Sequence, residues 1–89
     1  DMAAFAEAKP LAHPPGEHFV YSTADTMILC DLMTRMLTDS VRPQARRDAM
    51  MEFVRGRLMK PVGLASLTPE FDARGTMIGG AMMHMSARD

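Results

Sequence analysis

The stretch that decides the fold reads Pro14-Pro15-Gly16-Glu17-His18-Phe19-Val20-Tyr21-Ser22-Thr23. Its first three residues force a rigid bend, because proline fixes φ and the glycine that follows permits a turn. Residues 18–21 then run extended. Ser22 precedes an apolar-periodic segment and Asp25 follows three positions later, which is the pattern of a helix start with a reciprocal cap. The stretch therefore predicts a helix that begins directly after Ser22.

Tyr21 lies one residue before this predicted cap. The positive end of a helix dipole favours a phenolate, and a tyrosine held there can act as a general base. The ordinary alternative is a half-buried aromatic side chain at a loop-to-helix junction, and residue chemistry alone favours that alternative. Tyr21 is thus a candidate general base.

The helix after Ser22 is the clearest element of the chain. Its apolar residues recur at helical spacing, and they are Ile28, Leu29, Leu32, Met33, Met36 and Leu37. Asp31, Thr34 and Arg35 occupy the opposite face. This pattern predicts that the apolar stripe is buried and the polar face solvated, with an end at Thr38-Asp39-Ser40.

Two further helices are expected. A short one over residues 2–8, capped by Asp1, places Met2, Phe5 and Ala6 on one face and ends at Lys9-Pro10. A longer one begins at Pro43 and ends at Pro61-Val62-Gly63. Its predicted buried stripe comprises Ala45, Ala49, Met50, Phe53, Val54 and Leu58. The basic side chains around that stripe predict a solvated face, and they are Arg42, Arg46, Arg47, Arg55, Arg57 and Lys60.

The last part of the chain has no helical period. Turns are expected at residues 68–70 and 72–75, and a short strand or extended segment over residues 76–80, where Gly79-Gly80 permits a close backbone approach or a positive φ. The predicted fold class is therefore mainly α: about three helices with short irregular or extended segments, forming a single partial domain over residues 1–89.

Composition excludes several function classes. The net charge is −1, with 10 basic and 11 acidic residues, so the chain lacks the basic excess of a nucleic-acid-binding surface. A single cysteine excludes an internal disulfide, and the three histidines have no metal-ligand spacing. No metal and no cofactor are expected. The 11 methionines, with no tryptophan, indicate either a loosely specified core or an adaptable binding face.

Four segments, in order, resemble the serine β-lactamase and penicillin-binding-protein-like hydrolases. They resemble most the class C-like branch, which includes esterases and 6-aminohexanoate-dimer hydrolases. The stretch from Pro15 to Thr23 resembles the family's PG-x-x-[FW]-x-Y-S-[NST] motif. Leu58–Leu64 resembles the motif L-F-x-P-L-G-M. Phe71–Gly80 resembles the motif D-x-x-G-T-F-x-G-[SG], and Met85–Asp89 resembles the motif A-T-A-R-D.

The resemblance implies an acyl-enzyme mechanism, in which a serine of a Ser-x-x-Lys motif is acylated while a lysine and a tyrosine move protons. Tyr21 matches that tyrosine as the catalytic residue. Thr23 stands where β-lactamases usually carry asparagine, so it is a substrate-binding candidate and an ester or amide substrate is favoured over a lactam. Ser22 and Thr23 have a helix-capping role as their alternative.

No serine of this chain has lysine three positions later. The resemblance therefore implies a helical subdomain excised from a larger α/β + α serine hydrolase, inactive alone, whose first partner is the remainder of the parent chain. Ser86-Ala87-Arg88-Asp89 reads as the cap of a further helix, which also indicates a segment of a longer protein. Relatives are often periplasmic or secreted, but no targeting segment assigns a compartment here.

A different class of function fits the same residues. The chain could be a stand-alone helical interaction module that uses a Met-rich apolar face as a groove. In either case, exposed Met-rich faces would favour self-association.

Overall fold

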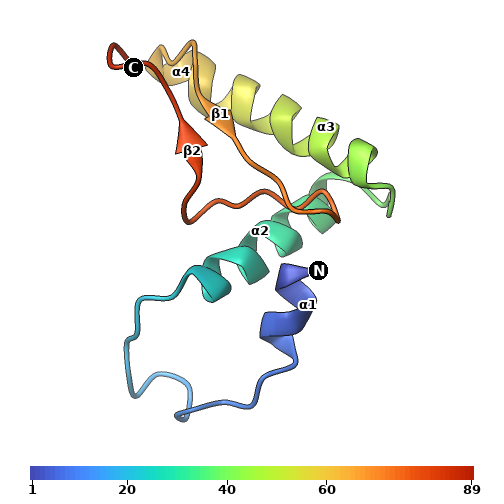
Figure 1. The fold of residues 1–89 in the computed structure, drawn as a ribbon, viewed down its shortest axis with the longest axis vertical. Helices are drawn as coiled ribbons and strands as arrows, with labels where there is room; N and C mark the ends of the chain where they lie inside the picture. Colours follow the sequence, from blue (N-terminus) through green and yellow to red (C-terminus); the bar gives the residue numbers. More distant parts are fainter.

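The computed structural model describes all 89 residues, and three helical rods dominate it (Figure 1). They are α1 (Met2–Glu7), α2 (Thr23–Leu37) and a rod made of α3 (Pro43–Val54), a π-helical turn (Arg55–Met59) and α4 (Lys60–Val62). Two short strands, β1 (Thr68–Pro69) and β2 (Met83–His84), pair antiparallel. The mainly α prediction is confirmed. None of the helices has the length and apolar character that crossing a membrane requires.

The start of the chain folds as predicted. The Asp1 carboxylate caps α1 by accepting a hydrogen bond from the Ala4 amide at 3.1 Å. α1 packs against α2 and buries Ala3. Its helical residues end at Glu7, shortly before Pro10, because the residues that precede a proline disfavour the helical region.

α2 begins after Ser22 and ends before Thr38, as predicted, but the predicted cap is wrong. Ser22 has the extended backbone of an N-cap residue, yet its side chain makes no capping hydrogen bond. The amides of the first turn therefore lack a side-chain cap from Ser22, and Asp25 is the one acidic residue in that turn.

The orientation of α2 is opposite to the predicted one. The face that is buried carries Met27, Cys30, Asp31 and Thr34, and the predicted apolar stripe is largely exposed, including Leu29, Leu32, Met33, Met36 and Leu37. The buried polar side chains have partners. Thr34 donates from Oγ1 to the Cys30 carbonyl at 2.8 Å, and Asp31 binds Arg46. A hydrogen-bonded polar face has thus displaced a more apolar one from the interior.

The rod of α3 and α4 buries Met50 and Val54, as predicted, but exposes Leu58 and buries Met59. The π-helical turn over Arg55–Met59 explains the shift. One extra residue per turn moves the buried position from four to five residues beyond Val54. Gly63 ends the rod with φ +78°, and Leu64 donates back to the Met59 carbonyl, as expected for a glycine cap.

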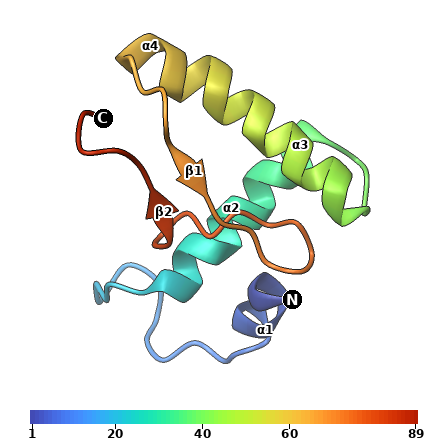
Figure 2. The same ribbon diagram turned by 45° about the horizontal axis from the view of Figure 1, so that its top comes forward.

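The core lies where the last part of the chain folds back over α2 and α3 (Figure 2). It consists of Cys30, Met50, Val54, Met59, Leu67 and Met77. The turn over residues 72–75 is confirmed, and Phe71 and Met77 form an isolated antiparallel bridge across it. The turn predicted at residues 68–70 is wrong, because Thr68 and Pro69 pair with His84 and Met83 as β1.

The end of the chain is fastened by hydrogen bonds to the residues that follow α4. The Asp89 carboxylate accepts hydrogen bonds from the backbone amides of Ala65 and Ser66 and from the Ser66 hydroxyl. The Ser86 amide donates to the same Ser66 hydroxyl at 2.8 Å. Two of the four residues predicted to cap a further helix, Ser86 and Asp89, therefore form a clasp that holds the last segment against Ala65 and Ser66.

Candidate functional site

Tyr21 lies at the end of the connection between α1 and α2, one residue before the Ser22 cap position. Its side chain is 83% exposed, and the neighbouring Phe19 is 92% exposed. The half-buried junction residue that the ordinary alternative describes is not what the structure shows. The phenol is open to whatever approaches this end of α2.

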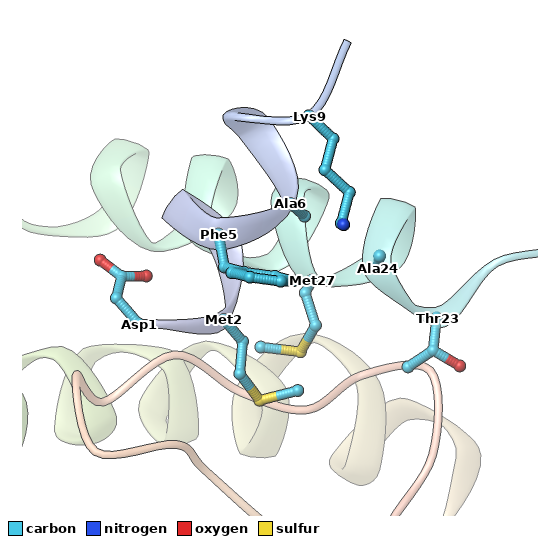
Figure 3. Close-up of a pocket in the computed structure, with 8 residues that line it drawn as sticks. All are labelled: Asp1, Met2, Phe5, Ala6, Lys9, Thr23, Ala24 and Met27. Atoms are coloured by element: carbon cyan, nitrogen blue, oxygen red, sulfur yellow. The ribbon is translucent and has the colours of Figure 1, made fainter. Parts of the chain in front are cut away.

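Thr23 is the first residue of α2 and lines a cleft between α1 and the start of α2 (Figure 3). Tyr21 does not line this cleft. In Figure 3 the Thr23 methyl group faces the cleft and its hydroxyl turns away. The structure therefore does not gather the two predicted site residues, which lie close in sequence, around one cavity.

The cleft that Thr23 lines has a volume of about 500 Å³. Its walls are mostly apolar and consist of Met2, Phe5, Ala6, Ala24 and Met27. Asp1 and Lys9 add charge at its edges. The predicted shared face of Met2, Phe5 and Ala6 on α1 is confirmed, and that face forms one wall.

Cys30 offers no accessible nucleophile. Its side chain is buried in the core, and burial raises the pKa of its thiol, although a backbone hydrogen bond with Gly79 works in the opposite direction. A thiol with a raised pKa holds little thiolate at neutral pH. Cys30 therefore serves as a small packing residue of the core.

The histidines do not form a metal centre. The rings of His13 and His18 contact each other in the connection between α1 and α2, with 4.0 Å between their centroids and a tilt of 36° between their planes. No group of three histidine, cysteine, aspartate or glutamate side chains in the structure is arranged to hold a metal ion.

A buried polar network joins α2, α3 and the 72–75 turn, and sequence reasoning does not single it out. Arg46 donates to Asp31 at 2.5 Å, to the Thr76 hydroxyl at 2.8 Å and to the Arg74 carbonyl at 3.0 Å. The prediction that Arg46 lies on a solvated face is wrong. Its five donors let it serve several acceptors at once, so it is stable inside. The one signal of this network in the sequence is that Arg35 follows Asp31 by four residues, the spacing of an ion pair on a helix, and the two pair at 2.6 Å.

Comparisons with protein families, with curated proteins and with solved structures found no match to this chain.

Proposed function

We propose that residues 1–89 are the helical subdomain of a serine hydrolase of the β-lactamase-like family, and that Tyr21 is a general base in the parent enzyme. Four motifs in family order support this proposal. The structural observation that carries it is the free phenol of Tyr21, 83% exposed at the start of α2. A general base must be reachable by the group whose proton it takes.

In the proposed mechanism, a serine from outside residues 1–89 attacks the carbonyl of an ester, amide or lactam. The serine proton passes to the Tyr21–lysine pair, which returns it to the leaving oxygen or nitrogen as the bond from that atom to the acyl carbon breaks. Water then attacks the acyl-enzyme, one of its protons goes back to the serine oxygen, and the acid product is released. Thr23, at the first position of α2, is the proposed substrate-binding residue. With threonine at this position, an ester or amide substrate is favoured over a lactam.

Residues 1–89 alone are expected to be inactive. The only serines are at positions 22, 40, 66 and 86, and none is followed by lysine three positions later. A tyrosine without a nucleophile and an oxyanion hole lacks the preorganised electrostatics that supply most of the rate enhancement.

The test uses the protein translated from the complete reading frame around this segment. That frame is expected to encode a Ser-x-x-Lys motif, and a chromogenic short-chain ester is expected to give a burst and an acyl adduct visible by mass spectrometry. Tyr21→Phe is expected to slow acylation by about 10²- to 10⁴-fold.

Val20→Ala is the matched control, because Val20 is an exposed neighbour of Tyr21 that occupies a variable position of the motif. Acylation by this variant is expected to stay at the wild-type rate. A reading frame without Ser-x-x-Lys, or a Tyr21→Phe variant that acylates normally, would refute the proposal.

A second candidate, an interaction module, is favoured by one observation: the outward face of α2. Leu29, Leu32 and Met36 are all more than half exposed on that face. An exposed apolar stripe of this kind favours association with another apolar surface or with a second copy. If the chain is an interaction module, the protein is expected to sediment as a concentration-dependent oligomer. The double variant Leu32→Lys/Met36→Lys is then expected to be a monomer.

A further inference from the structure

We propose that the cleft between α1 and the start of α2 binds a small aromatic carboxylate. This inference does not rest on the proposed hydrolase function. Tyr21 does not line the cleft, and Thr23, which does line it, carries no part of the argument. It rests on the chemistry of the walls, on one unpaired cation and on the volume.

The walls favour an aromatic body. The thioethers of Met2 and Met27 and the ring of Phe5 project into the same space (Figure 3). Met27 forms the floor, since it is only 1% exposed. Thioether sulfur makes favourable contacts with aromatic rings, and ring–ring contacts add to the burial of apolar area.

The charges favour an anionic end group. The Lys9 Nζ atom lies 4.6 Å from the centroid of the Phe5 ring. Lys9 forms no ion pair in the structure, even though the acidic residues Glu7 and Asp25 are neighbours of cleft residues in the sequence. The Asp1 carboxylate is already engaged, by the Ala4 amide at 3.1 Å and by Arg74 at 3.8 Å. Asp1 and Lys9 also lie on opposite sides of the cleft (Figure 3). The free charge is therefore positive, and a carboxylate complements it.

The volume favours a small molecule. About 500 Å³ lies within the usual range of ligand pockets, roughly 300–1,000 Å³. One aromatic ring with a short chain fits that space, with the ring among the methionines and the chain leading to Lys9.

The experiment titrates the protein with phenylbutyrate and maps amide chemical shifts by two-dimensional NMR. Shifts are expected to concentrate in residues 2–9 and 23–27. Lys9→Gln is expected to weaken phenylbutyrate binding by about threefold to fivefold, the effect of one exposed ion pair. The neutral analogue phenylbutanol is expected to bind the wild type and Lys9→Gln equally, and the cationic analogue phenylbutylamine to bind the wild type less tightly than phenylbutyrate.

Two bulky variants separate filling of the cleft from a change in the surface. Ala24→Trp places an indole in the cleft and is expected to abolish binding, whereas Ala4→Trp lies on an exposed position of α1 that does not line the cleft and is expected to leave binding unchanged. Equal effects of the two variants, shifts centred on Leu29, Leu32 and Met36, or equal affinity of phenylbutyrate for the wild type and Lys9→Gln would overturn the proposal. None of these outcomes depends on whether the parent protein hydrolyses esters.

Discussion

The Asp31 carboxylate of α2 and the Arg46 guanidinium of α3 are joined inside the protein, with 2.5 Å between Oδ1 and Nη2. Replacing Arg46 with methionine removes this pair and also the donors to Arg74 and Thr76. A buried carboxylate that loses its main partner destabilises a fold strongly, by about 3–5 kcal/mol. Urea denaturation followed by circular dichroism is expected to show Arg46→Met with that loss, a large share of the stability of a small domain.

Arg35→Met is the matched control for that prediction. Arg35 also pairs with Asp31, but its side chain is 62% exposed. An exposed ion pair contributes at most about 1 kcal/mol. If Arg35→Met destabilised the protein as much as Arg46→Met, the buried pair would not be what holds α2 to α3.

Gly75 is expected to tolerate no side chain. Its φ is +81°, and a Cβ atom there would overlap the backbone carbonyl of Pro43 at the start of α3. Gly75→Ala therefore combines backbone strain with a steric clash and is expected to lower the free energy of unfolding by more than about 2 kcal/mol.

Gly63 provides the comparison, since its φ is +78° but nothing lies within 4 Å of the position that a Cβ atom would take. Gly63→Ala is expected to show only the strain, about 1 kcal/mol. Thermal unfolding of the two variants measures the difference. Equal losses of stability would mean that the backbone at Pro43 shifts to make room for the new Cβ atom.

Gly79 and Cys30 are expected to be coupled. A Cβ atom at Gly79 would lie 2.5 Å from Cys30 Sγ. Gly79→Ala should destabilise the protein, and Cys30→Ala should recover part of that loss in the double variant, because it removes the sulfur that is in the way. A double-mutant cycle measures the coupling energy. Strict additivity of the two single changes would show that the segment around Gly79 moves instead.

The clasp at Asp89 is expected to open in acid. Hydrogen bonds from the Ser66 hydroxyl and amide hold the pKa of the Asp89 carboxyl below its ordinary value. The clasp is therefore fully formed above the ordinary aspartate pKa of about 3.9 and is lost as the pH falls through the lower pKa of the folded state. The Ser66 amide chemical shift is expected to report this transition, and Asp89→Asn should abolish it. A Ser66 transition that persists in Asp89→Asn would assign it to another group.

Local signals predicted the local structure well. The Asp1 cap, the ends of α2, the glycine end of α4, the 72–75 turn and the close approach at Gly79 all depend on neighbouring residues, and the structure has each of them. The side chain at Ser22 is the exception, because a capping pattern in sequence does not ensure that the bond forms.

Long-range choices were not predictable in the same way. The helical spacing of the apolar residues predicted that Leu32 and Met36 are buried. The buried face of α2 instead carries Asp31, which pairs with Arg46 fifteen residues later in the sequence. Nothing separates Arg46 from the five other basic residues around it except its place in the fold. The π-helical turn likewise moved the buried position from Leu58 to Met59, a register change that an ideal helical period does not contain. The exposure of the Tyr21 side chain likewise depends on the tertiary fold and not on the sequence around it.

A long connection over residues 8–22 joins α1 to α2. It has no helix or strand and carries Pro10, Pro14 and Pro15. Exposed connections of this kind are preferred sites of proteolytic nicking. After a single cut there, α1 would be retained by its packing on α2, by the Asp1–Arg74 contact and by the Met2 amide on Asp72. A cut in this connection therefore divides the chain into two pieces that remain associated, with α1 still forming one wall of the cleft.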